Sequence, residues 1–327
     1  MKIALIQPAE VLEWERGEID RITGLLQADR GSLGFELVSA ADKADLVVLL
    51  ESCTFKTQHD IPMYKALIGA HRADRLYCIN YEDGPPGFLP GLYSSLESFR
   101  FDSKLHLSWP HLRLPNAGAE TEPVAVPAAE RPFLFTFSGA CSHPLRRIVF
   151  DAFETSPGRH KVREIKRWYD HSAAEKQAYV DDIVNTKFVL CPRGIASYSH
   201  RILETMALGR VPVVIADDWV PFSIPESDYL LRVPERDVGD LGRILEAAEG
   251  RYEALCQRVR EVYQAYYTPT VRYPVALRHL LALKQRSLGK FDEACLLARW
   301  NSRSLWRNNG WSLDQRIGRK LRKLVGA

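Results

Sequence analysis

The sequence predicts an α/β protein made of two parallel-sheet units, and three observations lead to this prediction. Short apolar runs of strand length alternate with longer helical stretches in both halves of the chain. The runs are continuously apolar, as expected of strands buried on both faces of a parallel sheet. A chain of 327 residues with 46% apolar content is long enough to bury two cores.

The first third of the chain alternates strands and helices from its beginning. The expected strands are 3–6, 35–39, 46–50 and 76–80, and the expected helices are 18–26 and 62–70. Such alternation produces βαβ units and hence a parallel, doubly wound sheet. Residues 114–129 are rich in Pro, Ala and Glu and lack periodicity, so we expect them to link the two units.

The second half repeats this alternation and ends in a segment of different character. We expect strands at 133–138, 188–191, 211–215 and near 233, and helices at 145–154, 172–185 and 240–267. From residue 302 onward the chain is basic, and residues 312–325 place aliphatic side chains on one helical face. The predicted organisation is an N-terminal unit at 1–120, a second unit at 121–285 and a basic amphipathic tail at 286–327.

The densest group of polar side chains lies where the expected strand 188–191 passes into a helix. Residues 192–194, Pro-Arg-Gly, end the strand, and Ser197 or Ser199 can cap the helix that follows. Gly209 ends that helix. In open α/β sheets, ligands bind beyond the carboxyl ends of the strands, and helix N-termini attract anions. The junction is therefore the first candidate for a binding site.

The side chains at this junction suit a nucleoside diphosphate. Arg193 and Arg201 can hold a diphosphate through paired N–H donors, and Glu204 can accept hydrogen bonds from ribose hydroxyls. The alternative is that the arginines are solvated and that Glu204 pairs with Arg201 on one helix face. Five polar groups at one strand–helix junction favour the nucleotide site.

These motifs resemble the signature of the exostosin family of glycosyltransferases, family 47. The resemblance is carried by Pro192, Arg193, Gly194, Ser199, Arg201, Glu204, Ala207, Pro212, Val213, Asp217, Trp219, Pro221 and Phe222. A second stretch, 133–140 with Arg146 after it, resembles the phenylalanine-rich block that precedes the signature in that family. Together the resemblance covers about residues 131–235.

The resemblance implies a GT-B fold, in which two Rossmann-like domains face each other across a cleft and the second holds the nucleotide-sugar. It also implies inversion at the anomeric carbon, typically without a metal. Carried over to this sequence, Glu204 binds the ribose and Ser199 adds a hydrogen bond. Arg146, Arg193 and Arg201 neutralise the diphosphate. Eukaryotic members usually begin with a membrane anchor, which this sequence lacks, so a Golgi setting gains no support.

An inverting transfer needs a general base to deprotonate the acceptor hydroxyl. In a GT-B arrangement the base comes from the first unit, at the carboxyl end of a strand. Asp83 is the first candidate, Glu82 the second and Glu51 the third. Turn preference explains Asp83-Gly84 equally well.

Asp217 and Asp218 invite comparison with the Asp-x-Asp motif through which many glycosyltransferases hold manganese. The two aspartates are adjacent, so on an extended chain their side chains diverge. We therefore expect no metal site here. Asp217 or Asp218 is expected to bind hydroxyls of the donor sugar or to cap the turn that follows.

Composition bounds the partners and the compartment. A net charge of +3 gives no basic field on the scale of nucleic-acid binding, and no apolar run approaches the roughly 20 residues of a membrane span. Six scattered cysteines and an expected strand that begins at residue 3 favour a cytoplasmic protein without a signal peptide. The tail is either an interfacial helix at the inner face of the membrane or a helix that packs on a domain or a second copy.

The predicted function is a metal-independent, inverting glycosyltransferase without a cofactor. It moves a sugar from a nucleotide diphosphate, by resemblance UDP, to a saccharide or glycolipid acceptor. One alternative is an enzyme that uses a GDP-sugar, as fucosyltransferases do. The other is a catalytically silent subunit that binds a nucleotide-sugar beside an active partner.

Overall fold

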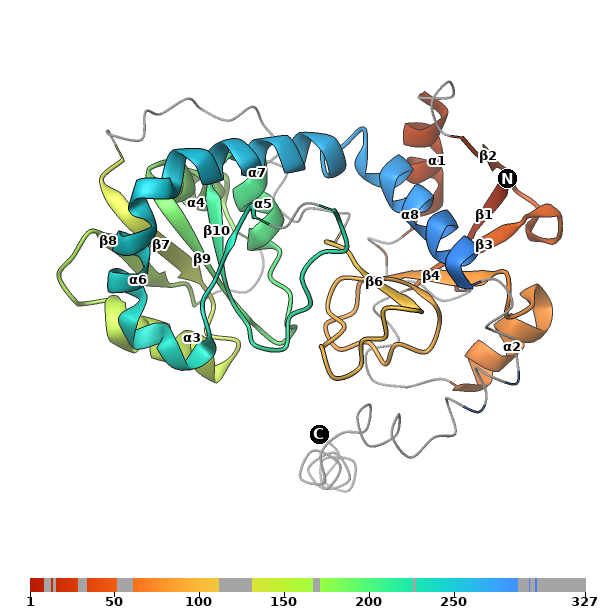
Figure 1. Ribbon diagram of the computed structural model, residues 1–327, viewed down its shortest axis with the longest axis horizontal. Helices are drawn as coiled ribbons and strands as arrows, with labels where there is room; N and C mark the ends of the chain where they lie inside the picture. The colour runs from red at the N-terminus through yellow and green to blue at the C-terminus, as the bar shows by residue number, and fades with distance from the viewer. Residues whose placement is uncertain are drawn as a thin grey trace.

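Two parallel sheets, each covered by helices, lie side by side in the computed structural model of the chain (Figure 1). The structure describes residues 1–8, 13, 16–28, 34–51, 61–111, 131–166, 171–225, 228–287, 294 and 298. The predicted linker 114–129 and the basic tail from 302 lie outside these residues. No helix in the described ranges is both long enough and apolar enough to cross a bilayer.

The first unit is a six-stranded parallel sheet in the order β2-β1-β3-β4-β5-β6. Its strands are β1 (Lys2–Ile6), β2 (Glu36–Leu37), β3 (Leu46–Leu50), β4 (Leu76–Asn80), β5 (Gly91–Tyr93) and β6 (His106–Ser108). Helices α1 (Glu18–Ala28) and α2 (Ile61–His71) connect the strands, with a short 3₁₀ turn at Ala41–Lys43. Every side chain of β3 and β4 is buried, as their apolar sequences predict.

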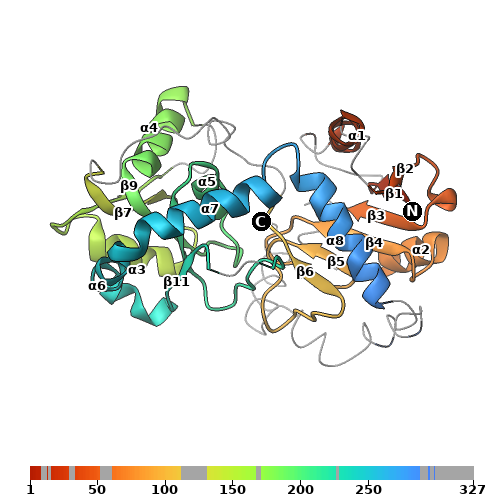
Figure 2. The ribbon, with the colours of Figure 1, turned by 45° about the horizontal axis from the view of Figure 1, so that its top comes forward.

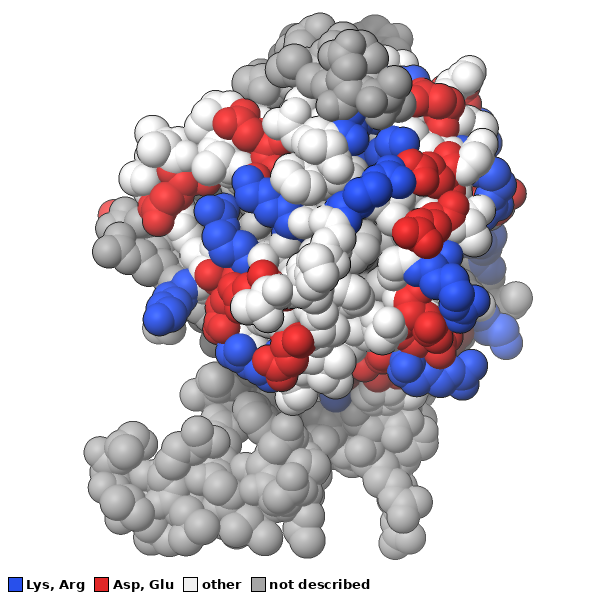
Figure 3. Space-filling view, turned by 90° about the vertical axis from the view of Figure 1, so that its left-hand side faces the viewer, with Lys and Arg blue, Asp and Glu red and all other residues white. Residues whose placement is uncertain are grey.

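The second unit is a five-stranded parallel sheet in the order β11-β10-β9-β7-β8. Its strands are β7 (Phe133–Gly139), β8 (His160–Glu164), β9 (Thr186–Pro192), β10 (Val211–Ile215) and β11 (Leu231–Arg232). Its helices are α3 (Pro144–Phe153), α4 (Ala173–Val184), α5 (Arg201–Ala207), α6 (Leu241–Ala248) and α7 (Tyr252–Tyr266), with 3₁₀ turns at Glu235–Asp240 and Glu249–Arg251. On the outer side of this unit acidic and basic side chains are interspersed (Figure 3).

The chain returns to the first unit after α7, and this corrects the predicted domain boundary at 285. Helix α8 (Arg272–Ser287) packs on α1 and β5 and lies across the first sheet (Figures 1 and 2). Tyr273 donates from its hydroxyl to Glu18 at 3.1 Å, and Lys284 donates to the Asp74 carbonyl at 2.5 Å. The first unit therefore consists of both ends of the described chain.

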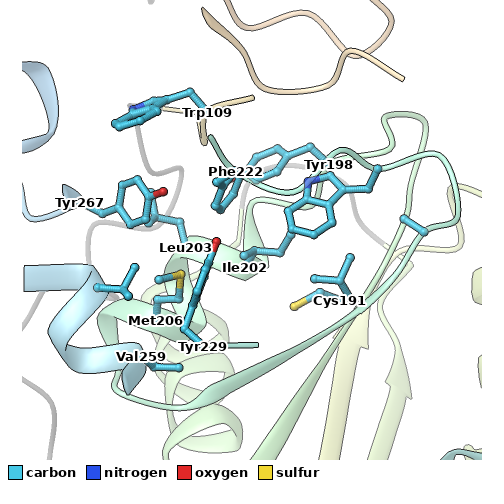
Figure 4. Close-up of a cluster of buried hydrophobic side chains, with 14 of the residues drawn as sticks. Trp109, Cys191, Tyr198, Ile202, Leu203, Met206, Phe222, Tyr229, Val259 and Tyr267 are labelled. Carbon is cyan, nitrogen blue, oxygen red and sulfur yellow. The ribbon is translucent and has the colours of Figure 1, made fainter. Parts of the chain in front are cut away.

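An aromatic seam joins the two units. Trp109, which follows β6, stacks edge-on against Tyr267 at 5.6 Å between ring centroids, and Tyr267 contacts Phe222 of the second unit at 5.7 Å. These rings lie above Leu203 and Met206 of α5 (Figure 4). All belong to one buried cluster that continues from the first sheet into the second. The units are thus packed together through an apolar core.

The predicted alternation of strands and helices is confirmed, and four of its details are wrong or missing. Strand β8 was not predicted, because charged side chains alternate through its sequence. The expected single helix 240–267 is two helices, α6 and α7, separated by the 3₁₀ turn at Glu249–Arg251. Strands β5 and β6 were not predicted, because three residues are too few to show a period of two. The helix at Arg272–Ser287 was missed as well.

Candidate functional site

A cavity of about 1140 Å³ opens at the carboxyl ends of β7, β8 and β9. In the strand order, β8 lies on one side of β7 and β9 lies on the other, so the chain reverses its direction of winding between β7 and β9. This is the topological switch point, where open α/β sheets bind their ligands. The cavity is also lined by residues of α4, of the loop 194–200 and of α5.

Arg201 is the buried cation of this cavity. Its Nη2 donates to the Ser138 carbonyl at 2.6 Å, and its guanidinium lies 4.7 Å from the centre of the Phe137 ring. Its Nε is buried and has no hydrogen-bond partner among the described residues. A buried donor without a partner is costly. An anion in the cavity would supply the missing acceptor.

Glu204 lines the same cavity one helical turn beyond Arg201. It is buried, and Tyr179 of α4 donates a hydrogen bond to its Oε2 at 2.6 Å. Burial raises the pKa of Glu204, while the Tyr179 hydroxyl and the Arg201 charge oppose that shift. A carboxylate held in this way can accept hydrogen bonds from vicinal hydroxyl groups.

Arg146 of α3 lines the cavity and also fixes two of its loops. It donates to the carbonyls of Ala140, Pro192 and Arg193 at 3.0, 3.2 and 3.1 Å. Burial, and then the charge of Arg201, lower the pKa of Arg146 to about 10, so it remains protonated at neutral pH. Arg146 thus ties the ends of β7 and β9 together and adds a second positive charge to the cavity.

Two glycines allow these arginines to lie close to the backbone. A Cβ on Gly139 would lie 2.9 Å from Nη2 of Arg201. A Cβ on Gly194 would lie 2.8 Å from Oγ of Ser142 and 3.0 Å from Nη2 of Arg146. The glycines of both sequence motifs are therefore explained by close approach of a side chain.

Ser199 lines the cavity as predicted, but the expected serine cap is wrong. Helix α5 begins at Arg201, its N-cap is His200, and no side chain caps it. Ser197 instead donates from Oγ to the carbonyl of Ser95 in the first unit at 3.3 Å. The serine-rich loop therefore serves both the cavity and the contact between the units.

Arg193 and Asp217 do not line the cavity, which corrects their predicted positions. Arg193 forms ion pairs with Glu97 of the first unit at 3.1 Å and with Asp218 at 3.4 Å. Asp217 accepts a hydrogen bond from the backbone N–H of Glu235 at 3.0 Å, and the Glu235 carboxylate accepts one from its N–H at 3.1 Å. This reciprocal pair joins the end of β10 to the following 3₁₀ turn.

Among the three predicted bases, the structure places Asp83 on the cavity lining. Of the described residues that line the cavity, it is the one that the first unit contributes. Glu82 is buried next to it, with its backbone N–H on the Asn80 side chain at 3.0 Å. Glu51 is buried and receives hydrogen bonds from Asn80 and, at 3.2 Å, from Tyr64. Neither Glu82 nor Glu51 is among the lining residues.

Several lining residues were not predicted from the sequence. His200 contacts His111 of the first unit, with 4.7 Å between ring centroids, and Tyr198 at 5.4 Å. Its position beside Arg201 in the motif was the available signal. Three exposed basic residues, Arg163, Lys166 and Lys176, also line the cavity. Tyr179 could not be predicted from the sequence, because its contact with Glu204 joins two separate helices.

Comparison with known proteins identifies a domain in the middle of the chain. Residues 94–248 match the exostosin GT47 domain. An Arabidopsis thaliana protein, the probable glucuronoxylan glucuronosyltransferase IRX7, is 43% identical over 83 residues, which is 24% of this chain and 18% of that protein. The Caenorhabditis elegans exostosin-1 homolog is 37% identical over 101 residues, or 30% of this chain and 26% of that protein.

A third relative is the probable beta-1,4-xylosyltransferase IRX10 of Arabidopsis thaliana, 40% identical over 103 residues, or 31% of this chain and 23% of that protein. The chain thus spans well under two thirds of each of these relatives. Among solved structures, the lipopolysaccharide outer core galactosyltransferase WaaB has a TM-score of 0.48 at 12% identity, over 87% of this chain and 100% of that one.

Proposed function

Residues 94–248 belong to the exostosin GT47 family, and on that premise we propose that this chain is an inverting glycosyltransferase of the GT-B type. It transfers a sugar from a nucleotide diphosphate to a hydroxyl group of a saccharide or glycolipid acceptor. The observation that carries the proposal is the cavity at the switch point of the second sheet. There, Arg201 and Glu204 lie buried one helical turn apart.

The cations of the cavity suit the departing diphosphate. As the bond between the anomeric carbon and the β-phosphate oxygen breaks, negative charge grows on the phosphate. Arg201, with its buried Nε donor, and Arg146 supply positive charge in a site of low dielectric constant. These guanidinium groups support a reaction that proceeds without a divalent metal, which activity in EDTA tests directly.

Asp83 is the proposed general base. It takes the proton of the acceptor hydroxyl, whose oxygen attacks the anomeric carbon from the face opposite the diphosphate. Asp83 is suited to this role because it faces the cavity from the other unit. His200, which precedes Arg201 on the cavity lining, is the alternative base.

The donor is proposed to be a UDP-sugar. The names of the relatives include a xylosyltransferase and a glucuronosyltransferase, so pentoses and uronic acids join hexoses among the sugars to be tested. The experiments below also distinguish this donor from a GDP-sugar, and an active enzyme from a silent subunit.

A thermal-shift panel of UDP-, GDP-, dTDP- and CMP-sugars tests donor binding, because a ligand of the folded state raises the Tm by mass action. We expect a shift with UDP-sugars that disappears in Glu204→Ala and remains in Glu253→Ala, an exposed glutamate of α7. A shift with GDP-sugars alone would select the fucosyltransferase-like alternative. The absence of any shift would contradict the proposal.

Replacement of the candidate groups tests the base. We expect kcat/KM to fall at least about 100-fold in Asp83→Asn, the lower range for general base catalysis. Activity that Asp83→Asn leaves intact, together with loss of activity in His200→Gln, would assign the role to His200. Donor binding without turnover would favour the silent subunit.

A further inference from the structure

A loop of the first unit is docked on the residues that end the strands of the second sheet. This docking loop comprises residues 94–100, directly after β5. Its Ser98 N–H donates to the Asp218 carbonyl at 2.9 Å, and its Ser95 carbonyl accepts from Ser197. The GT47 match begins at residue 94, so it includes the docking loop together with the lining that the second unit gives to the cavity.

Arg193 forms the ion pair between the second unit and the docking loop. Its guanidinium lies between Glu97 of the docking loop and Asp218 of the second unit. The side chains of Arg193 and Glu97 are only 12% and 19% exposed. An ion pair so shielded from water is less screened than a surface pair, and breaking it leaves a half-buried charge without its partner.

The backbone of Arg193 is bound by a residue that lines the cavity. Arg146, whose guanidinium lines the cavity, donates from Nε to the Arg193 carbonyl at 3.1 Å. Arg146 thus fixes the position of the Arg193 backbone, while the Arg193 side chain binds Glu97 of the first unit.

On the first unit, the docking loop holds the turn that bears Asp83. Arg100 lies 3.9 Å from Glu97, and its Nη1 donates to the carbonyls of Gly84 and Pro85 at 3.4 and 3.0 Å. Gly84 follows Asp83 directly in the chain. A continuous set of contacts therefore runs from Arg146 through Arg193, Glu97 and Arg100 to the backbone beside Asp83.

We propose that Arg193 is a positioning residue, which acts through Glu97 and Arg100 to place Asp83 opposite the anion site. The inference rests on the proposed function for its catalytic consequence. The physical reason is that acceptor activation needs Asp83 within hydrogen-bond reach of the hydroxyl, and a misplacement of about 1 Å can cost 100-fold in rate. Arg193 does not contact the donor in this role.

Kinetics of Arg193→Gln, Glu97→Gln and the double variant test the proposal. We expect each single variant to lower kcat about tenfold or more while the UDP-sugar thermal shift is retained. The double variant should be no slower than the slower single variant, because both changes break one contact. Arg193→Lys, which keeps the charge, should recover part of the rate. The matched control is Arg159→Gln, which breaks the 2.6 Å ion pair with Glu249 within the second unit.

Hydrogen exchange supplies a readout that does not depend on activity. Arg193→Gln and Glu97→Gln should accelerate amide exchange at residues 83–87 as well as 94–100, and Arg159→Gln should leave both segments unchanged. Unchanged exchange at 83–87 would overturn the proposal, whatever the activity. Loss of the thermal shift in Arg193→Gln would overturn it too, since Arg193 would then act on the donor. A wild-type protein with no thermal shift and no turnover, but with the expected exchange, would refute the proposed function and leave the positioning contacts supported.

Discussion

The contacts of Phe137 explain the aromatic side chain two residues before Gly139 in the phenylalanine-rich block 133–140. The guanidinium groups of Arg201 and Arg146 lie 4.7 and 5.6 Å from the centre of its ring. The face of an aromatic ring attracts cations, and it offers this attraction without consuming the N–H donors. Phe137 therefore helps to hold two like charges near each other.

Gly139→Ala should weaken donor binding much more than it weakens the fold. The added Cβ would lie 2.9 Å from Nη2 of Arg201 and would displace the end of that side chain. One charge-assisted hydrogen bond contributes about 1.5–3 kcal/mol, so we expect the Kd of the UDP-sugar to rise at least about tenfold. Calorimetric titration measures the Kd, and urea denaturation measures the stability. An unchanged Kd would show that the Arg201 guanidinium is not held close to Gly139.

Glu51 is a buried carboxyl group with consequences for stability. Burial raises its pKa to about 7, against the hydrogen bonds from Asn80 and Tyr64 that favour the charged form. In the unfolded chain the pKa is near 4.5. The folded state therefore keeps the proton on Glu51 over a range of pH in which the unfolded chain has lost it.

The stability that this proton provides should decline as the pH rises. It is fully present below about pH 4.5 and is lost as the pH passes through about 7, at up to about 1.4 kcal/mol per pH unit. Glu51→Gln stays neutral, so its free energy of unfolding should not show this decline. Urea denaturation of both proteins between pH 5 and pH 8 measures the difference. A wild-type curve that rises over this range relative to the variant would contradict the prediction.

At the scale of elements, helix α4 forms one wall of the cavity, and its N-terminus carries a clear sequence signal. Ser172 and Glu175 form a capping box, in which the serine Oγ accepts from the Glu175 N–H at 3.2 Å and the glutamate accepts from the Ser172 N–H at 2.8 Å. These bonds satisfy orphan donors of the first turn. The helix then presents Tyr179 to Glu204.

Ser172→Ala should destabilise the protein by about 1 kcal/mol, the usual cost of losing an N-cap side chain. Because Ser172 also lies on the cavity lining, donor affinity is the second quantity to measure. We expect the loss of stability in urea denaturation and a change in Kd below about threefold, since Tyr179 lies two helical turns further on. A larger loss of affinity would mean that Ser172 contacts the donor.

At the scale of the whole molecule, the two units depend on each other. The chain begins in the first unit, builds the second and returns through α8, and Trp109, Phe222 and Tyr267 bury a shared seam (Figure 4). A buried cluster that continues through both sheets favours cooperative unfolding.

Trp109→Ala should cost about 3–5 kcal/mol and should separate the unfolding of the two units. Trp109 is 1% exposed, so its removal leaves a cavity at the seam. We expect one calorimetric transition in the wild type and two in the variant, with Trp109→Phe closer to the wild type. A single transition in Trp109→Ala would show that other contacts maintain the cooperativity.

The sequence predicted which side chains of the second unit share the cavity, because most of them are close together in the chain. Arg201, Glu204 and Ser199 belong to one loop and helix, so their spacing already brings them to one place, and the structure puts all three on the cavity. Arg146 also reaches the cavity, because α3 follows β7 directly. The carboxyl ends of parallel strands share one edge of the sheet, and the alternating pattern was enough to predict that edge.

Tertiary structure decided what depends on partners far away in the chain. Arg193 lies in the same motif as Arg201, but a carboxylate 96 residues earlier turns it away from the cavity, and Asp217 likewise pairs with Glu235. The sequence alone determined the parallel α/β units and the polar strand–helix junction of the second unit, since periodicity and short spacing fix those. Only the fold decided which carboxylate of the first unit lines the cavity and where the chain returns to that unit, because contacts between residues far apart in the sequence produce no periodic pattern.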